Sequence, residues 1–385
     1  MAPHMIERGK TVIISGLTRD LRLLLEISTA MVAEKDLGRL LDLIVRDTST
    51  VMDAERCTLY LYDEDRRELV SRIALGMEVK EIRLPADHGI AGHVAMSRDL
   101  VNIPDAYADS RFDRQWDEKS GFQTRNVLCG PLVTHEGRVV GVLQVLNKRN
   151  GAFTESDIAL FTAFSAHAAV AIENASLYEE REKLLQSLIR SLAAAVDARD
   201  PVTAGHSDRV GKYATLVAEE MGLAAGERRV LDIAASLHDV GKIGVRDAVL
   251  LKAGQFTPEE RQEVQGHVAR TRDILNQVYF PRDLRGVVDV AGAHHERMDG
   301  SGYPLKIAGD RMPVPARILA VVDVFDALTA YDRPYKKAWT SEKAFGILEN
   351  TREFDPVVVA ALKQVVARRG ILVAPAPAPA VPAAT

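Results

Sequence analysis

The residues best suited to chemistry are histidines and carboxylates in the second half of the chain. Two histidines are adjacent, a third is followed directly by an aspartate, and another aspartate lies inside an apolar run at residues 318–325. A carboxylate in such a run is costly to bury unless a cation compensates its charge. The candidate metal ligands are His206, His238, Asp239, His267, His294, His295 and Asp323.

These side chains suit two neighbouring metal ions. Consecutive helical residues point about 100° apart, so His294 and His295 are expected to face one metal each, as are His238 and Asp239. The Asp239 carboxylate has two oxygens and can bridge the ions. Two six-coordinate ions offer about twelve positions, of which about four then remain for water and substrate oxygens. Open positions are typical of a catalytic metal site.

The stretch after the paired histidines predicts a rigid, open loop beside the metals. Gly300 and Gly302 permit backbone conformations closed to other residues and let a ligand approach the main chain. Pro304 then fixes the exit from the loop. In the apolar run, Asp326 lies three residues after Asp323, so the two carboxylates share one helix face.

Taken in order, these residues resemble the HD-GYP family of phosphodiesterases that act on cyclic di-GMP, a branch of the HD-domain hydrolases. The matching stretches are residues 203–210, 238–244, 267, 294–304, 317–329 and 333–336. The resemblance implies a compact all-α bundle that holds two divalent metal ions through the candidate ligands above. Iron or manganese is favoured, with zinc, cobalt or nickel as alternatives.

The same resemblance implies further roles. Asp239 and Lys242 would be catalytic, with Lys242 stabilising phosphate charge or assisting the leaving group; a solvated loop lysine is the alternative. The substrate-binding residues would be Gly302, Tyr303, Asp326, Arg333 and Lys336.

Two departures from the family pattern matter. Some members bind a third metal through a glutamate one turn before the first histidine, but Val202 stands there and predicts a two-metal site. Residues 330–332 make the spacing between Thr329 and Arg333 one residue longer than in many relatives. The phosphate contacts of Arg333 and Lys336 therefore carry over from the family less directly than the metal ligands do.

The expected reaction is hydrolysis of cyclic di-GMP to linear pGpG, with GMP on further cleavage. One alternative is a phosphodiesterase for another cyclic dinucleotide or a linear nucleotide. A second is a catalytically silent receptor that signals through partners. The complete ligand set and Lys242 argue against silence.

The first half of the chain predicts an α+β domain with an antiparallel sheet. Apolar residues at helical spacing predict helices at 21–33 and 37–52, and a short helix is expected at 89–95. Alternating, β-branched stretches predict strands at 57–62, 69–75, 79–84, 127–134 and 138–146.

This region resembles a GAF domain, the small-molecule sensor module of signalling proteins. Asn147, Lys148, Phe153 and Asp157 match the motif of cyclic-nucleotide-binding members, although Ile158 replaces a glutamate. The resemblance implies a small-molecule or cyclic-nucleotide ligand at these residues. The alternative is structural, with Thr154 and Asp157 capping the next helix.

A long helix is expected from residue 154 to residue 199. Tyr178, Leu185 and Leu192 are seven residues apart, and so are Arg181, Leu188 and Ala195. This two-heptad stripe predicts a parallel homodimer seam. A linker helix packed on its own domain is the alternative.

The expected organisation is an extension at 1–20, the GAF-like domain at 21–175, a linker helix at 176–200, the HD-GYP domain at 201–372 and a disordered Ala/Pro tail at 373–385. Within the helical domain, Thr257 followed by Pro258 predicts a capped helix start.

Composition narrows the class of protein. A net charge of −5 argues against a general nucleic-acid binder. Cys57 and Cys129 lie in apolar strands and are expected to be buried, reduced thiols. The first ten residues lack the apolar core of a signal peptide, and no apolar window of about 20 residues is expected to span a membrane. We expect a cytoplasmic protein.

Overall fold

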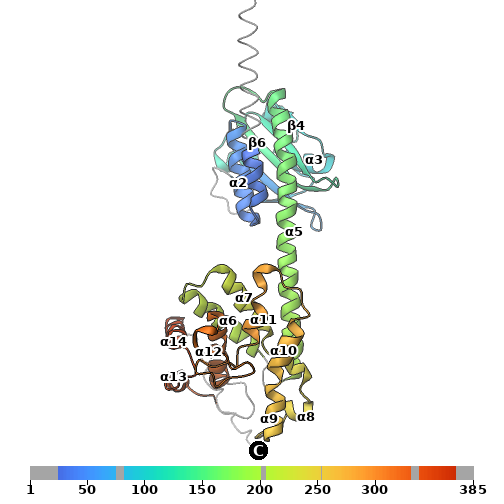
Figure 1. The fold of residues 1–385 in the computed structure, drawn as a ribbon. Coiled ribbons are helices and arrows are strands. Elements are labelled where there is room, and N and C mark those ends of the chain that lie inside the picture. Colours follow the sequence, from blue (N-terminus) through green and yellow to red (C-terminus); the bar gives the residue numbers. More distant parts are fainter. Residues whose placement is uncertain (1–24, 75–81, 201–204, 253, 331–337, 370–385) are drawn as a thin grey trace, which may run out of the picture. The chain divides into compact units, whose positions relative to one another are not determined.

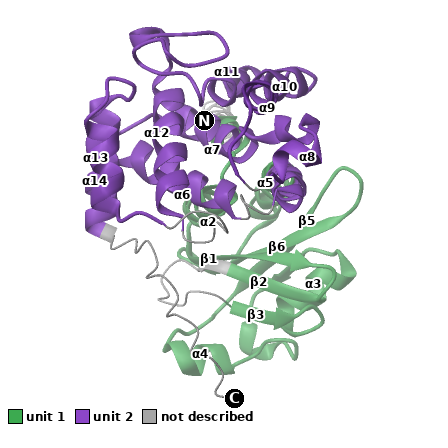
Figure 2. Cartoon of the chain, turned by 90° about the horizontal axis from the view of Figure 1, so that it is seen from below, with its two compact units in different colours: residues 1–183 green, residues 184–385 purple. Residues whose placement is uncertain are grey.

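The computed structural model describes residues 25–74, 82–200, 205–252, 254–330 and 338–369. It divides into two compact units, residues 1–183 and 184–385 (Figure 2). The expected extension at 1–20, the tail at 373–385, and Val202, Arg333 and Lys336 lie outside the described residues.

Unit 1 is built on one six-stranded antiparallel sheet with the strand order β3-β2-β1-β6-β5-β4. Its longest strands, β1 and β6, pair at the centre, with Cys57 opposite Val145. The strands are β1 (Ala54–Asp63), β2 (Glu68–Ala74), β3 (Ile82–Pro85), β4 (Val101–Ile103), β5 (Val127–Val133) and β6 (Val139–Lys148). The predicted strands are therefore present, with shifts of a few residues at their ends.

Helices cover both faces of this sheet (Figure 1). A helix at residues 25–33, α2 (Leu37–Val51) and the start of α5 (Glu155–Arg199) form one apolar core with the sheet. On the other face lie α3 (Gly89–Ser97), η1 (Ala106–Ala108) and α4 (Gln115–Ser120). Gly130 permits the close packing of α5, because an added Cβ would lie 2.7 Å from the Phe161 ring. Cys57 and Cys129 are free and buried, as predicted.

Helix α5 is 45 residues long and runs from unit 1 into unit 2. Contrary to the expectation, it is long and apolar enough to cross a membrane by length and composition. Phe161 and Ile172 are nevertheless buried in the core of unit 1, and Ile189 and Val196 in that of unit 2. This burial indicates a core helix.

The predicted seam on α5 is only partly exposed. Leu185 packs against the core of unit 2, and the ring of Tyr178 lies 5.3 Å from the Lys35 ammonium. The apolar side chains that do face outward are Leu177, Leu184, Leu188 and Leu192, with exposed fractions of 53%, 60%, 54% and 54%. The exposed stripe thus shares Leu188 and Leu192 with the predicted one but not Leu185, which packs against the core of unit 2.

Unit 2 is a helical bundle around α12 (Val314–Thr329), whose residues Ile318, Leu319, Val322 and Phe325 are fully buried. Thr257 caps α9 through the predicted capping box with Glu260. The other elements are α6 (His206–Glu220), α7 (Ala225–Leu237), η3 (Val240–Gly244), α8 (Asp247–Leu250), α9 (Pro258–Gln265), α10 (His267–Leu275), η4 (Arg282–Leu284), α11 (Val287–Ala291), η5 (Gly309–Arg311), α13 (Ser341–Glu349) and α14 (Pro356–Arg369).

Candidate metal centre

The candidate ligands come from five separate segments of unit 2. His206 and His267 are the first residues of α6 and α10, and His238 and Asp239 directly follow α7. The adjacent histidines lie in a turn after α11, and Asp323 lies within α12. Most of these ligands therefore stand at helix ends, where side chains can converge on one point inside the bundle.

The structure brings the candidate ligands into two clusters. The His206 cluster consists of His206, His238 and Asp323, and the His267 cluster of His267, His294 and His295. Asp239 forms a third group with His238 and His294, one histidine from each cluster, and so links the two. Within each cluster, the potential ligand atoms lie within 4.8 Å of one another. This spacing suits one metal ion per cluster.

Asp239 lies between the two clusters. Its Oδ2 is 3.4 Å from Nε2 of His238, and its Oδ1 is 3.2 Å from Nε2 of His267 and 3.9 Å from Nε2 of His294. One carboxylate oxygen thus faces each cluster, which is the arrangement expected of a bridging ligand.

The prediction that His294 and His295 face one metal each stays a prediction, because both belong to the His267 cluster but His294 also groups with His238 and Asp239. The rings of His294 and His295 lie 4.2 Å apart at an angle of 42°. The helical rule of about 100° between neighbours does not apply here. The two residues follow the end of α11 in a turn, and the turn directs both rings the same way.

Hydrogen bonds to Nδ1 orient the histidine rings. In His238, His267 and His294, Nδ1 lies 2.8, 2.6 and 2.7 Å from the carbonyl oxygen three residues earlier. A carbonyl can only accept, so each Nδ1 carries the proton and each Nε2 keeps its lone pair. Such bonds fix the tautomer that binds metal.

Asp326 orients the ring of His206. Its Oδ2 accepts a 2.7 Å bond from Nδ1 of His206, and its Oδ1 accepts one of 2.7 Å from Nε of Arg209. The Asp326 residue is only 1% exposed. These contacts favour a positioning role over the expected substrate-binding one, because both carboxylate oxygens are already used inside the protein.

The donor set fits divalent metal ions. Nε2 of His238 is buried and has no hydrogen-bond partner among the described residues, although a buried imidazole nitrogen normally has one. It points between Asp239 and Asp323, whose nearest oxygens are 3.4 and 3.9 Å away. A lone pair aimed at two carboxylates is satisfied by a cation that all three groups share.

The charges of the site also favour a cation. Burial raises the pKa of the Asp239 and Asp323 carboxyls, but their neighbours outweigh it and hold both below their ordinary values: Lys242 and histidines for Asp239, and histidines for Asp323. Burial lowers the pKa of His294 well below its usual range and that of His295 to about 4. Burial opposes the charged form of His206 too, but bonds to Asp323 and Asp326 raise its pKa to about 9. Neutral imidazoles and ionised carboxylates are the forms that ligate metals. A metal would therefore displace a proton from His206 and from His238, since burial opposes the charged form of both but the neighbouring carboxylates raise their pKa.

Lys242 is not a solvated loop lysine. Its ammonium lies 2.7 Å from Oδ2 of Asp239 and 3.2 Å from Oδ2 of Asp200, and its side chain is 14% exposed. Burial lowers its pKa, but the two carboxylates outweigh this effect and raise it. Lys242 is therefore a fixed positive charge at the edge of the candidate metal centre.

The signature loop, residues 296–304, is held from inside. The buried Glu296 carboxylate accepts bonds from the backbone N–H groups of Leu305 (2.7 Å) and Ile307 (2.9 Å). Gly302 has another role than the predicted ligand approach, because an added Cβ would lie 2.5 Å from the Arg297 nitrogen. Its missing side chain makes room for the chain's own backbone.

Tyr303 lies against the metal ligands. Its ring stacks on His295 at 4.9 Å and 30°, and burial raises its pKa to about 12. Gly300 has φ +79°, as a left-handed loop position requires.

Gly241 and Thr271 form a support that the sequence did not reveal. The Thr271 hydroxyl donates to the His238 carbonyl (2.8 Å) and accepts from the Gly241 N–H (3.0 Å). A Cβ on Gly241 would lie 2.0 Å from the His267 carbonyl oxygen, so only glycine fits. The sequence analysis also did not identify Arg209 and Glu296 as parts of the site. The sequence indicates them only through their positions close to His206 and His295.

The candidate GAF ligand residues are engaged within unit 1. Asn147 is fully buried and bonds the Arg125 N–H, Glu55 and the Gln123 carbonyl. The Lys148 ammonium lies 2.7 Å from Asp157, which also accepts from the N–H and hydroxyl of Thr154.

Phe153, which completes this motif, is buried in the same core as α5 and lies 5.7 Å from the Lys148 ammonium. The motif therefore fixes the junction of β6 with α5, and these contacts support the structural alternative.

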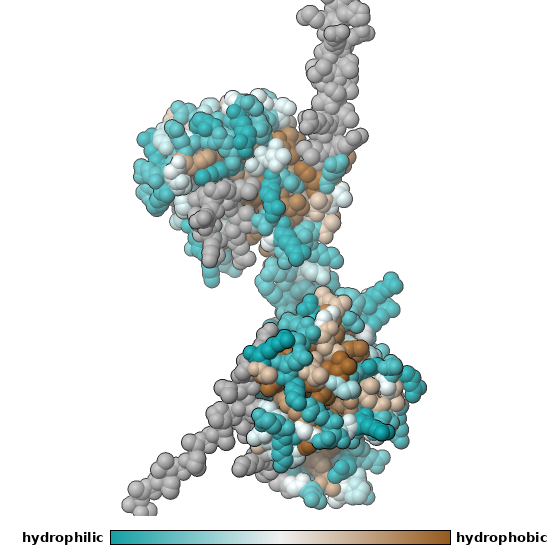
Figure 3. All heavy atoms as spheres, turned by 90° about the vertical axis from the view of Figure 1, so that its left-hand side faces the viewer, coloured by the Kyte–Doolittle hydropathy of each residue, from teal (hydrophilic) through white to brown (hydrophobic). Residues whose placement is uncertain are grey.

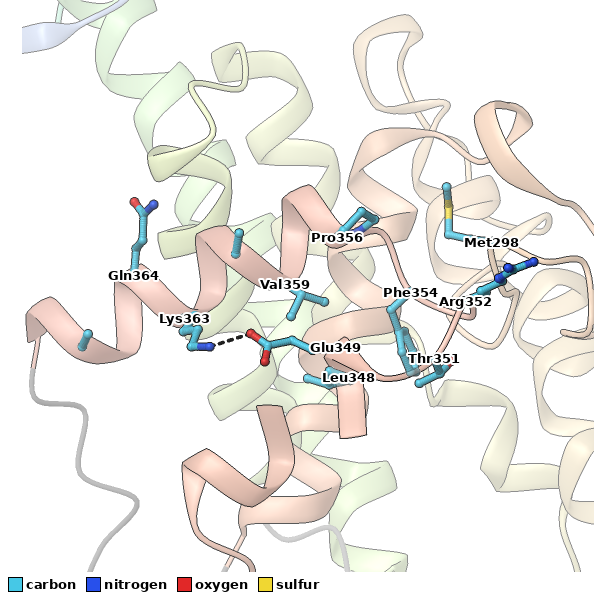
Figure 4. A pocket seen from close by; sticks show the side chains of 12 residues that line it. Met298, Leu348, Glu349, Thr351, Arg352, Phe354, Pro356, Val359, Lys363 and Gln364 are labelled. Atoms are coloured by element: carbon cyan, nitrogen blue, oxygen red, sulfur yellow. Dashed lines mark hydrogen bonds and ion pairs between the residues drawn. The ribbon is translucent and has the colours of Figure 1, made fainter. Parts of the chain in front are cut away.

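A groove of about 830 Å³ lies between α13 and α14 (Figure 4). Met298 of the signature loop lines it, together with Phe354 and the ion pair of Glu349 with Lys363. Figure 3 shows apolar surface on the face of unit 2 that carries these helices. None of the candidate metal ligands lines the groove, so it is separate from the candidate metal centre.

Comparisons with known proteins agree with both units. Residues 190–358 match the HD domain, and residues 36–172 match the GAF domain. The chain is 41% identical over 182 residues to the 3'3'-cGAMP-specific phosphodiesterase 3 of Vibrio cholerae. It is 43% identical over 190 residues to the cyclic di-GMP phosphodiesterase response regulator RpfG of Xanthomonas campestris.

These alignments cover 47% and 49% of this chain and 39% and 50% of the two relatives. The chain thus spans half or less of the length of each. Among solved structures, the GAF domain of a phosphoenolpyruvate-protein phosphotransferase from Coxiella burnetii aligns with 42% of this chain and 96% of its own, at 22% identity and a TM-score of 0.39. The chain carries a GAF domain followed by an HD domain, and its residues fit the HD-GYP type.

Proposed function

We propose that this protein is a metal-dependent phosphodiesterase that hydrolyses cyclic di-GMP to linear pGpG, and to GMP if cleavage continues. The observation that carries the proposal is the pair of histidine-rich clusters with Asp239 between them. A single metal would need only one such cluster. Two clusters joined by a carboxylate match a two-metal hydrolytic site.

Two divalent ions would be held by the His206 cluster and the His267 cluster, with Asp239 shared. Iron or manganese is the favoured metal, with zinc, cobalt or nickel as alternatives, since imidazole and carboxylate ligands suit all of them. Such ions supply an activated water near neutral pH and stabilise the charge on the phosphate. Bonds to Nδ1 keep the imidazoles in the ligating tautomer.

The protein's own groups would act around the phosphate. Lys242 places a buried positive charge beside Asp239, where it can stabilise phosphate charge or assist the leaving oxygen. Tyr303 and Gly302 would form the wall of the site on the side of His295. Arg333 and Lys336, which lie outside the described residues, would add phosphate contacts.

A second candidate substrate is 3'3'-cGAMP. It is favoured by one observation, namely that the relative with 41% identity is named as specific for that dinucleotide. A nucleotide receptor without activity is less well supported, because it would not need the complete set of ligands.

Regulation by unit 1 and a homodimer complete the proposal. Helix α5 runs from the GAF domain into the HD domain without a break, so a ligand-dependent change in unit 1 has a direct route. The exposed leucines of α5 would pair with those of a second copy. A cytoplasmic location follows from a nucleotide substrate found inside cells.

The deciding experiment is a substrate panel. Protein purified without oxygen is analysed for its metal content and incubated with cyclic di-GMP, 3'3'-cGAMP and cyclic di-AMP, each with iron(II) or Mn²⁺. Products are separated by chromatography. We expect pGpG from cyclic di-GMP, and faster turnover of 3'3'-cGAMP would favour the second candidate. The variant His238→Ala/Asp239→Ala is the control, and hydrolysis of none of the three substrates would contradict the enzyme proposal.

A further inference from the structure

The last turn of α5 lies against two of the three segments that carry the His206 cluster, the start of α6 and the stretch after α7. Asp197 accepts a bond of 3.2 Å from the hydroxyl of Ser207, the residue after His206. Arg199 donates to the carbonyls of Ile243 and Val245, just beyond Lys242. The connecting helix therefore ends on the structural elements of the candidate metal centre.

Asp200, the first residue after α5, reaches furthest into the site. It is only 4% exposed, and its Oδ2 lies 3.2 Å from the Lys242 ammonium. Lys242 is thus held between two carboxylates, with Asp200 on one side and Asp239 at 2.7 Å on the other.

Lys242 and a metal ion in the His206 cluster would compete for one atom. The ammonium contacts Oδ2 of Asp239, and this same oxygen faces Nε2 of His238 at 3.4 Å. A cation bound between His238 and Asp239 needs that oxygen. A second carboxylate that attracts the ammonium would release Oδ2 for the metal and would keep the lysine at the edge of the site.

We propose that Asp200 is a positioning residue that draws Lys242 away from Oδ2 of Asp239, and that Arg199 fixes the end of α5 so that Asp200 can do so. The inference rests on the proposed function only in taking Asp239 as a metal ligand. It makes the end of the connecting helix part of the metal centre, so that a movement of α5 changes the competition between Lys242 and the metal.

A double-mutant cycle tests this proposal by metal binding alone. Metal-stripped full-length protein is titrated with Mn²⁺ in a calorimeter, comparing wild type, Asp200→Asn, Lys242→Met and the double variant. We expect Asp200→Asn to weaken Mn²⁺ binding by about fivefold or more, the order found for coupled neighbours. In the Lys242→Met background the same substitution should have no effect, because no ammonium remains to compete.

Loss of a negative charge could weaken Mn²⁺ binding without Lys242, and the cycle separates the two causes. An equal fall in both backgrounds, or no fall in either, would overturn the proposal. Asp200→Glu keeps the carboxylate and should bind Mn²⁺ nearly as wild type does. Asp200→Ala replaces Asp200→Asn in the cycle if thermal melting shows that the latter is unfolded. Asp283→Asn is the matched control, because this carboxylate is 63% exposed and pairs with Arg229, away from Arg199 and Lys242.

The cycle does not depend on turnover. If wild type binds Mn²⁺ and the cycle behaves as expected but no cyclic dinucleotide is cleaved, the proposed function fails and the positioning role stands. If cleavage occurs and the cycle shows no coupling, the positioning role fails alone.

Discussion

At the scale of single residues, the candidate metal centre depends on side chains that do not themselves bind metal. Asp326 holds the His206 ring through Nδ1, and Arg209 holds Asp326 in turn. Changes to such partners of metal ligands typically lower metal affinity by about 10- to 100-fold. These contacts support a role for Asp326 in holding a metal ligand, whereas the family resemblance implied substrate binding.

Asp326→Asn separates these two roles. We expect Mn²⁺ affinity to fall by about tenfold, because the amide accepts more weakly from Nδ1 and loses its charge-assisted bonds to Arg209. Calorimetric titration of the metal-stripped protein measures this. Unchanged Mn²⁺ affinity together with a raised KM for the dinucleotide would indicate that Asp326 binds substrate and does not position a metal ligand. Asp289→Asn is the control, since that carboxylate is 67% exposed and pairs with Arg272.

Glycines offer a second test at this scale. Gly241→Ala should destabilise unit 2 and weaken Mn²⁺ binding, because its Cβ would lie 2.0 Å from the His267 carbonyl and 2.5 Å from the Thr271 nitrogen. Gly211→Ala in α6 is the matched control, since nothing lies within 4 Å of its added Cβ. That change should raise the free energy of unfolding by up to about 1 kcal/mol. Thermal melting of both variants checks the pair, and equal melting temperatures would contradict this account of Gly241.

The residue types of the site were predictable, but their partners were not. Histidines and aspartates at those spacings have few other uses, so the sequence revealed every member of the two clusters. The side-by-side position of His294 and His295 depends on a turn after α11, and helical periodicity cannot describe a turn. The contact of Asp200 with Lys242 joins segments 42 residues apart, and only the tertiary fold brings them together.

At the scale of elements, helix α5 has two faces with different functions. Its inner face supplies Ile172 and Ile189 to the two cores, and its outer face exposes Leu184, Leu188 and Leu192. The heptad spacing predicted an apolar stripe but could not say which side the cores would cover.

Leu188→Glu tests the outer face. We expect this change to convert a homodimer into a monomer, because it places a charge in the middle of the exposed leucines, and analytical ultracentrifugation measures the mass. Gln186→Glu adds the same charge about 160° away around the helix and should leave the dimer intact. A wild-type protein that sediments as a monomer, or a dimer that tolerates Leu188→Glu, would contradict this interface.

The junction of β6 with α5 predicts a pH dependence of stability. Burial raises the pKa of Asp157, but bonds from Lys148 and Thr154 outweigh it and lower the pKa below its ordinary value of 3.8. The folded form therefore binds this proton less readily than the unfolded chain does. The stabilisation is fully present above pH 4 and is lost as the pH falls through the folded pKa.

Asp157→Asn should accordingly destabilise unit 1 at pH 7 and flatten the loss of stability between about pH 4 and pH 2. Urea unfolding followed over this pH range measures the effect. The control is Glu155→Gln in the same helical turn, whose side chain is exposed. If the free energy of unfolding fell with pH as steeply in Asp157→Asn as in wild type, other carboxyl groups would be responsible for the acid dependence.

At the scale of the whole molecule, the sheet and the candidate metal centre belong to separate hydrophobic cores. Every member of the two metal clusters lies in unit 2, and the sheet with its covering helices lies in unit 1. This division was predictable because the hydrophobic period changes from alternating to helical along the chain. The boundary between the units was harder to predict. It falls after Lys183, inside one continuous helix, where no loop marks it.

Two cores predict two unfolding transitions, of which metal should shift only one. A ligand at 100 times its dissociation constant stabilises the form that binds it by about 2.7 kcal/mol. For a unit of this size, that raises the melting temperature by about 5 to 10 °C. Calorimetric scans of the full chain with Mn²⁺ and with EDTA should therefore differ in the transition of unit 2. Asp157→Asn identifies the transition of unit 1, because it lowers that one alone. Equal shifts of both transitions with Mn²⁺ would mean that α5 couples the units into one cooperative structure, and a signal from unit 1 would then reach the metal centre through stability as well as through movement.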